Sequence, residues 1–349
     1  MIKIYKKALI SILLLGAFAM RVHSQDVHFS QFDAAPTYFN PALAGLIDCN
    51  NRIIGNFKTQ WATYNSAMLS YDQKLSRLAT ARSQFGLGGF VNADYSGALS
   101  YGNVLGELTP AYHFEAIPSK LTLSVGLAAM FNYNSFNEAN AVSGSHIDPI
   151  TGETIYGGSD MENTSQFYWD LGAGVNAKYM VNENFPVNLG FAMKRLLENG
   201  GGLQDNSVSN YRRFSVNSNA VVPVNTIMSF LPSLIYIQQH RYNQLNFGTY
   251  FKYNLAHVTH IIEAAYVGVW YRWDDAVIFG LSADKLLGND WLLNFGINYD
   301  LTVSDFRSSN KWTSGQNVRS DSFEISIRLM NCKSPIRVVR QGIINDPFR

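Results

Sequence analysis

The sequence predicts an all-β protein: a transmembrane antiparallel β-barrel of about 14 strands with a non-strand segment before the first strand. Three observations support this fold class. Long runs alternate between apolar and polar residues, the composition is rich in aromatic and poor in charged residues, and the longest gaps between expected strands all fall at one end of the sheet. The competing fold is a secreted β-sandwich, whose strands are normally shorter.

The clearest alternating run is Trp291–Ser304. Apolar side chains occupy one face, namely Leu293, Phe295, Ile297, Tyr299, Leu301 and Val303. Small or polar ones occupy the other, namely Asn294, Gly296, Asn298, Asp300 and Thr302. Side chains alternate across a strand with a period of 2, so the run predicts one oily and one polar face. Membrane-barrel strands need ~9 to 11 residues with the apolar face toward lipid, so this strand is long enough to span.

Residues 1–24 have the pattern of a secretory signal peptide. A basic start with three lysines precedes the apolar run Ala8–Met20, and we expect cleavage between Ser24 and Gln25. Removal of these residues takes away four of the 27 basic residues and no acidic one, which leaves 23 Lys and Arg against 26 Asp and Glu. A nucleic-acid partner is therefore not expected, because its binding surface would be basic.

The rest of the chain has no apolar run near the ~20 residues of a membrane helix. A membrane location would then require a closed barrel, because only helices and barrels satisfy every backbone group in lipid. Aromatic residues make up 13% and charged residues 15% of the chain. Typical soluble domains have roughly 25% charged residues, so this composition favours a wall that faces lipid.

In chain order, residues 25–50 show no alternation and contain two prolines, so we expect a periplasmic segment or an inner plug. The barrel is expected over 51–330 and a periplasmic tail over 331–349. The expected strands are Asn51–Gln60, Ser66–Gln73, Gln84–Tyr95, Asn103–Phe114, Lys120–Tyr133, Phe167–Met180, Val187–Arg195, Arg212–Val221, Ser229–Gln239, Asn243–Asn254, Ile261–Tyr271, Ala276–Lys285, Trp291–Ser304 and Ser320–Met330. On their inward faces Phe90, Tyr168 and Met180 indicate a filled interior.

Loop lengths support a membrane barrel over a sandwich. If the N-terminus is periplasmic, the three longest gaps are extracellular, namely Asn134–Gln166, Leu196–Tyr211 and Asp305–Arg319. The even-numbered connections, which would then lie on the periplasmic side, are mostly short. Short periplasmic turns with long outer loops are typical of bacterial barrels.

The two cysteines flank the expected barrel, Cys49 before the first strand and Cys332 after the last. The first and last strands of a closed barrel pair, so both would lie at the periplasmic rim. Because the periplasm is oxidising, we expect a disulfide between them, with two unpaired buried thiols as the alternative.

No catalytic, metal-binding or cofactor-binding constellation emerges. The sequence has no GxSxG, HExxH or phosphate-loop motif. His257 and His260 lie near an expected turn without a third ligand, and His240 lies in a short outer turn beside Arg241. The acidic loop Asn134–Gln166 is interpreted as a hydrated surface loop, with binding of Ca²⁺ or of a basic partner as the alternative. The basic tail could dock on a periplasmic partner or form a disordered end.

Two stretches resemble a known family. FSQFDAAPTYFNPALAG (Phe29–Gly45) resembles the start of the PorP/SprF family of the type IX secretion system. NFGINYDLTVS (Asn294–Ser304), followed by SFEISIRL (Ser322–Leu329), is similar to that family's closing hairpin. The tail after Leu329 is longer than the family pattern.

The resemblance implies an outer-membrane barrel of the Bacteroidota that is not an enzyme. It would serve secretion or surface anchoring of large cargo proteins, often adhesins, and in some members gliding motility. The implied partners are a type IX cargo protein, periplasmic ring or lipoprotein components, and outer-membrane lipid. The residues assigned to partner binding are Phe39, Asn40, Pro41 and Gly45, with plugging of the lumen or nucleation of folding as the alternative. Two other functions stay open at this point: a passive porin, and a barrel hydrolase that uses an outer-rim histidine such as His240.

Overall fold

The structure, a computed structural model, describes residues 29–30, 34–61, 63–75, 79–80, 82–96, 101–136, 164–198, 211–256, 261–288, 290–304 and 321–332. The expected signal peptide, most of the acidic loop (137–163), nearly all of the C-terminal tail, and His257 and His260 lie outside these ranges. Within them, no helix is both long and apolar enough to cross a membrane.

One antiparallel sheet holds most of the described residues. Its strands are β1 (Asn51–Gln60), β2 (Tyr64–Leu75), β3 (Ser83–Ser96), β4 (Tyr101–Ile117), β5 (Leu121–Phe136), β6 (Thr164–Asn182), β7 (Phe185–Lys194), β8 (Arg213–Ala220), β9 (Val222–Pro223), β10 (Met228–Gln239), β11 (Tyr242–Asn254), β12 (Ala264–Arg272), β13 (Ala276–Leu287), β14 (Trp291–Thr302) and β15 (Ser322–Asn331). Apart from the two-residue β9, each strand corresponds to one that the alternating pattern predicts.

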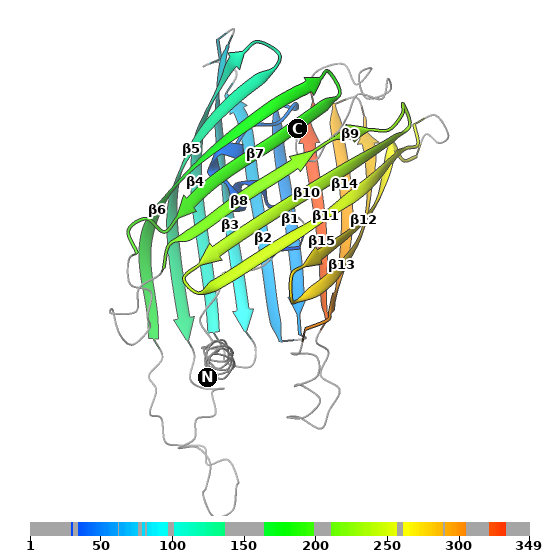
Figure 1. Ribbon diagram of the computed structural model, residues 1–349. Coiled ribbons are helices and arrows are strands. Elements are labelled where there is room, and N and C mark those ends of the chain that lie inside the picture. The colour runs from blue at the N-terminus through cyan, green and yellow to red at the C-terminus, as the bar shows by residue number, and fades with distance from the viewer. Residues whose placement is uncertain are drawn as a thin grey trace, which may run out of the picture.

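The sheet closes on itself through its first and last strands. Strand β1 pairs with β2 on one side and with β15 on the other, from Asn51 opposite Asn331 to Gln60 opposite Ser322. Every other neighbour follows in chain order, with β9 extending the β8 side of β10. Figure 1 shows the blue β1 beside the red β15. The predicted barrel of fourteen strands is confirmed.

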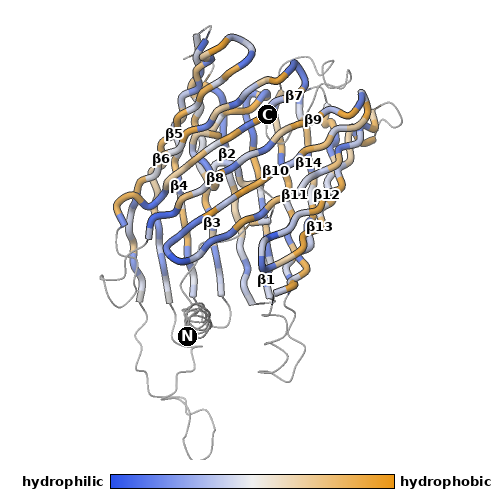
Figure 2. The backbone as a smooth tube through the Cα atoms, viewed as in Figure 1, coloured by the Kyte–Doolittle hydropathy of each residue, from blue (hydrophilic) through white to orange (hydrophobic). Residues whose placement is uncertain are grey.

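Alternation along each strand separates the two faces of the wall. In β14, Leu292 and Asn294 are buried, whereas Phe295 is 47% exposed. Large outward-facing hydrophobic side chains recur around the ring, among them Phe57, Leu69, Val91, Leu108, Phe131, Val175, Leu189, Phe251, Val267, Phe279, Phe295 and Ile327. Figure 2 shows the resulting change between hydrophobic and hydrophilic residues along the strands. This outer belt is the surface that a lipid bilayer covers.

The barrel has two distinct rims. The disulfide rim is where β1 begins and β15 ends, next to Cys49 and Cys332. The opposite rim, here called the loop rim, is where β5, β7 and β14 end. The ranges 137–163, 199–210 and 305–320 each follow one of these three strands. Since long outer loops are typical of bacterial barrels, we expect the loop rim to face outward.

Candidate functional site: the luminal segment

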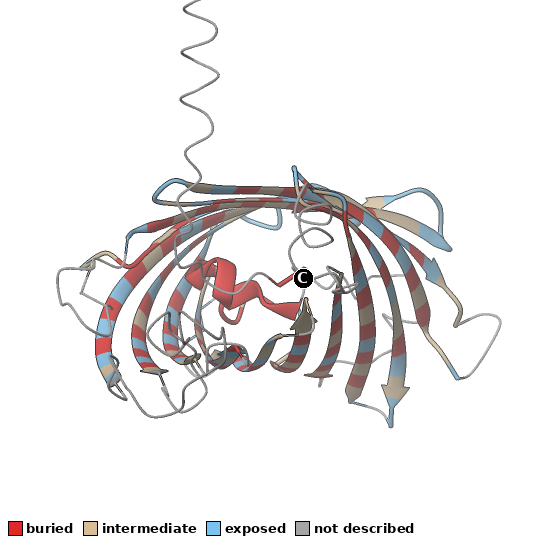
Figure 3. Ribbon diagram, turned by 90° about the horizontal axis from the view of Figure 1, so that it is seen from below, coloured by how far each residue is buried: buried red, intermediate tan, exposed pale blue. Residues whose placement is uncertain are grey.

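The chain before β1 lies inside the barrel. Residues 29–30 and 34–49, here called the luminal segment, include the short helix α2 (Pro36–Phe39) and the 3-10 turn η2 (Pro41–Leu43). Figure 3 shows these helical turns within the ring of strands, coloured as buried. Of the two placements that the sequence left open, the structure places the segment in the lumen.

The segment extends between the two rims. At one end the Ser30 hydroxyl donates to Asp300, two residues from the loop-rim end of β14. At the other end Cys49 joins β1 at the disulfide rim and forms a disulfide with Cys332, with Cα atoms 4.3 Å apart. The luminal segment is therefore linked covalently to the strand that closes the barrel.

An Asn-Pro turn forms the middle of the segment. Proline suits the first helical position because its φ is already helical, and asparagine is a favoured N-cap. The Asn40 side chain accepts from the Ala42 N–H at 2.9 Å. Its amide nitrogen donates to the Val175 carbonyl and to Asn217 Oδ1, both at 3.0 Å. One side chain thus caps the turn and also binds two strands of the wall.

Three neighbouring strands place a glycine under this turn. A Cβ added at Gly126, Gly174 or Gly190 would lie less than 3.0 Å from atoms of Asn40, Pro41 or Ala42. The small inner face of β5, β6 and β7 therefore lets the Asn-Pro turn lie directly on the wall, with its backbone against Gly126 and the Asn40 and Pro41 side chains against Gly174 and Gly190. Further along, Gly45 has a φ of 70°, a conformation that suits glycine.

The wall binds the segment largely through its backbone. Wall side chains donate to the backbone carbonyls of residues 37–39, 44 and 45, and one wall carboxylate accepts from a backbone N–H of the segment. The pairs are Lys194 Nζ to Thr37 O (3.1 Å), an Arg213 guanidinium nitrogen to Tyr38 O (2.6 Å), Ser215 Oγ to Phe39 O (2.7 Å), His113 Nε2 to Ala44 O (2.9 Å), Gln84 Nε2 to Gly45 O (3.2 Å) and Gly45 N to Asp72 Oδ2 (2.9 Å). Each satisfies a polar group that would otherwise be buried at a cost of about 1–3 kcal/mol.

Buried ion pairs supply several of these contacts. Lys194 pairs with Glu107 at 2.6 Å, and both side chains are at most 4% exposed. Further buried pairs among the described residues are Arg52 with Asp72 (2.9 Å), Lys58 with Asp300 (3.2 Å) and Arg272 with Asp300 (2.5 Å). Lys194, Asp72 and Asp300 each bind both an ionic partner and the luminal segment. The luminal charges are therefore part of the attachment of the segment.

Aromatic rings complete the packing. The Tyr38 ring lies edge-on to Phe29 and Phe90, with centroids 5.7 and 5.6 Å apart. The Arg213 guanidinium lies 4.3 Å from the Tyr38 ring centroid, a cation–π geometry. Phe90 is one of the inward residues from which the sequence predicted a filled interior, and it packs on the segment.

The predicted partner-binding residues are all inside the barrel. Phe39 is 3% exposed and Asn40 is fully buried, and Pro41 and Gly45 are also buried. Their contacts are with the inner wall, which matches the plug alternative. A role in binding a partner stays a prediction. Sequence reasoning missed Lys194, Arg213 and His113, whose only local signal is a charged or ionisable residue on the inward face of a strand.

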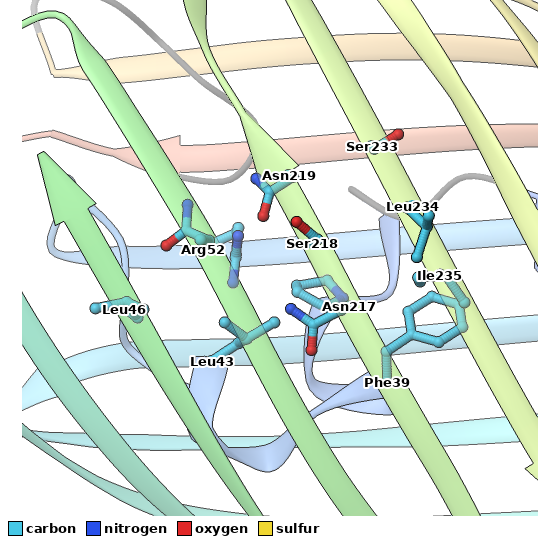
Figure 4. A pocket seen from close by; sticks show the side chains of 12 residues that line it. Phe39, Leu43, Leu46, Arg52, Asn217, Ser218, Asn219, Ser233, Leu234 and Ile235 are labelled. Carbon is cyan, nitrogen blue, oxygen red and sulfur yellow. The ribbon is translucent and has the colours of Figure 1, made fainter. Parts of the chain in front are cut away.

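A small cavity remains between the segment and the wall of β7, β8 and β10 (Figure 4). Its volume of about 30 Å³ is room for a water molecule or two. Its lining includes Phe39, Leu43 and Leu46 from the segment and Asn188, Asn219 and Ile235 from the wall.

In the described ranges, no group of three or more His, Cys, Asp or Glu side chains is placed to hold a metal ion. His240 stacks on Tyr211 at a centroid distance of 3.8 Å.

The family model described as type IX secretion system membrane protein PorP/SprF matches residues 22–320. The chain belongs to the PorP/SprF family. The resemblance drawn from the two ends of the sequence is thereby confirmed. The match covers the luminal segment and all of the barrel except the end of the chain from 321 onward. The comparison with curated proteins gives no match.

Solved structures with a similar fold include two described as monoaromatic hydrocarbon channels. The CymD monoaromatic hydrocarbon channel has a TM-score of 0.50 at 10% identity, over 86% of this chain and 92% of that one. The deltaS2 mutant of the TodX monoaromatic hydrocarbon channel has a TM-score of 0.50 at 11% identity, over 83% and 91%. A Pseudomonas aeruginosa FadL homologue has a TM-score of 0.49 at 11% identity, over 85% and 94%. At these identities the first two show a shared barrel fold and nothing more.

Fold and family together place this PorP/SprF protein in the outer membrane as a component of the type IX secretion system. The family and the fold are in general non-enzymatic. The expected cleavage after Ser24 lies outside the described residues.

Proposed function

We propose that this PorP/SprF protein supports secretion or surface anchoring of specific type IX cargo proteins by binding other proteins, and that it does not conduct the cargo through its lumen. The observation that carries this proposal is the luminal segment itself. A chain crossing the barrel would have to displace residues that are buried, hydrogen-bonded to the wall and joined to β1 at Cys49.

The energetics support binding over passage. The backbone of the segment accepts charge-assisted bonds from Lys194 and Arg213 and a neutral bond from Ser215. Bonds to charged groups contribute ≈ 1.5–3 kcal/mol each and neutral ones ≈ 0.5–1.5 kcal/mol. Together these three contacts alone oppose displacement of the luminal segment from the lumen by several kcal/mol.

The proposed partners are a cargo protein, which can be a gliding adhesin, and periplasmic ring or lipoprotein components of the secretion system. The two rims are the surfaces that reach water on either side of the membrane. We assign cargo contact to the loop rim and contact with periplasmic components to the disulfide rim, where the 331–349 tail begins. A passive porin is the alternative that the test must exclude.

The test is deletion of the gene followed by comparison of surface and medium proteins that carry type IX C-terminal signals. We expect loss of one or a few large proteins, restored by the intact chain and by a Gly55→Ala control. A chain lacking Phe39–Gly45 should not restore them. An unchanged secretome would refute the proposal, and ion conductance by the intact protein in planar bilayers would then support the porin.

A further inference from the structure

The contacts between the wall and the luminal segment have the character of peptide recognition. Five wall side chains bind backbone carbonyls of the segment, and Asp72 binds a backbone N–H. Such contacts depend on the path of the peptide and on few of its side chains. Domains that bind an extended peptide along a sheet edge likewise obtain affinity from backbone bonds and specificity from a few pockets.

Only a short pattern of side chains in the segment is required by these contacts. Tyr38 fills the space among Phe90, Phe29 and Arg213, and Asn40 binds Val175 and Asn217. The glycine surface beneath the turn, together with Gly86 beside Ala44, leaves little room for side chains at 42, 44 and 45. The fitting peptide therefore has an aromatic residue, then an Asn-Pro turn, then small residues.

The wall also has binding capacity that the segment does not use. Asn188 and Asn219 line the small cavity and are 2% and 7% exposed. Among the residues that the structure describes, neither polar atom of the Asn188 side chain, nor the Nδ2 of Asn219, has a hydrogen-bond partner. The two residues lie opposite each other on β7 and β8. A primary amide offers a donor and an acceptor, which is the complement of a peptide group.

We propose that the inner wall of β2 to β8 is a peptide-binding groove that the protein's own luminal segment occupies, and that its second ligand is a peptide of the same pattern supplied by a secretion partner. This inference rests on the proposed function, in which the protein binds other proteins. The partner peptide would take the place of Thr37–Gly45, next to Asn188 and Asn219.

The main chain that joins the luminal segment to β1 through Cys49 determines how such an exchange can be observed. A segment tethered by a few residues has an effective concentration in the millimolar range at its own site. A free peptide would therefore have to compete with millimolar ligand, and binding to the intact chain would be weak. Cutting the tether removes this advantage and leaves the groove unchanged.

The experiment uses the full chain with a protease recognition sequence inserted after Asp48, whose side chain is 53% exposed at the disulfide rim. After folding and cleavage, a fluorescent synthetic peptide of residues 29–45 is added, and its binding is followed by anisotropy. We expect the peptide to exchange into the cleaved protein and not into the uncut one. The same peptide with Asn40→Ala should bind at least ~10-fold more weakly, since three hydrogen bonds are lost.

Matched serine variants test whether the wall contacts carry the affinity. Ser215→Ala removes the donor to the Phe39 carbonyl and should weaken binding by roughly 2- to 12-fold. Ser282→Ala is the control, because that luminal hydroxyl accepts from Asn294 of the wall. Failure of the peptide to exchange into cleaved, folded barrel would overturn the inference, as would equal binding of a scrambled peptide. Neither result depends on cargo secretion, so the proposed function is tested separately.

Discussion

Replacing Gly126 by alanine should loosen the luminal segment while leaving the barrel closed. A Cβ at this position would lie 2.3 Å from the Pro41 carbonyl carbon, whereas ordinary contacts begin at 3.4 Å. The segment must then move by about 1 Å, because the clash is with backbone and cannot be relieved by rotation of a side chain. A movement of that size would lengthen the 3.0 Å bonds of Asn40 beyond hydrogen-bonding range.

The expected cost follows from these two effects. Overpacking costs typically 1–3 kcal/mol, and each neutral hydrogen bond contributes ≈ 0.5–1.5 kcal/mol. With partial relaxation the docked state should lose about 2–4 kcal/mol, which is roughly a 30- to 900-fold change in the docking equilibrium. Other wall residues, among them Lys194 and Asp72, also bind the segment. Their contacts should keep most molecules in the docked state at equilibrium.

Hydrogen–deuterium exchange of the segment's amides in detergent is the assay. Exchange at Ala42 and Gly45 should accelerate by roughly 30- to 900-fold, while the amides of β1 and β14 stay protected. Gly55→Ala is the matched control, because an added Cβ there meets no atom within 4 Å. Equal exchange in the two variants would refute the close-packing argument. Parallel loss of protection in the strands would show that the segment and the barrel are one cooperative unit.

Three further predictions concern the ion pairs, the disulfide and the lumen. Lys194→Met leaves the buried Glu107 without its cation and should lower the free energy of unfolding by about 3–5 kcal/mol, with Glu107→Gln in the same chain recovering part of it; unchanged urea midpoints would contradict this. Alkylation under non-reducing, denaturing conditions should add no mass to the protein, and two adducts should appear only after reduction; two adducts beforehand would show free thiols at Cys49 and Cys332. Deletion of residues 34–45 should raise single-channel conductance in planar bilayers well above that of the intact chain, and equal conductance would mean that the segment does not block the lumen.

The strands could be predicted because their signal is local. A period of 2 in hydrophobicity requires only neighbouring residues, so β1 was predicted with both ends correct and β14 to within two residues at its end. The pairing of β1 with β15 also followed, since a lipid-exposed sheet must close on itself. The proximity of Cys49 and Cys332 was a consequence of that closure.

The inner contacts could not be predicted in the same way. Asn40 binds Asn217, 177 residues away, and Arg213 binds the Tyr38 carbonyl across 175 residues. No local sequence pattern distinguishes an inward-facing residue that binds the segment from one that faces water in the lumen. Which of them meet depends on the register of every intervening strand pair and on the path of the segment.

By itself, the sequence determined a membrane barrel, its strands, its seam and its family, because alternation, loop length and two short motifs are properties of neighbouring residues. Only the tertiary structure decided that Phe39, Asn40, Pro41 and Gly45 lie inside the lumen. The physical reason is steric and electrostatic: glycines from three strands leave space for the Asn-Pro turn, and Lys194, Arg213 and Ser215 bind carbonyls of the segment. Neither condition exists until the ring of strands has closed.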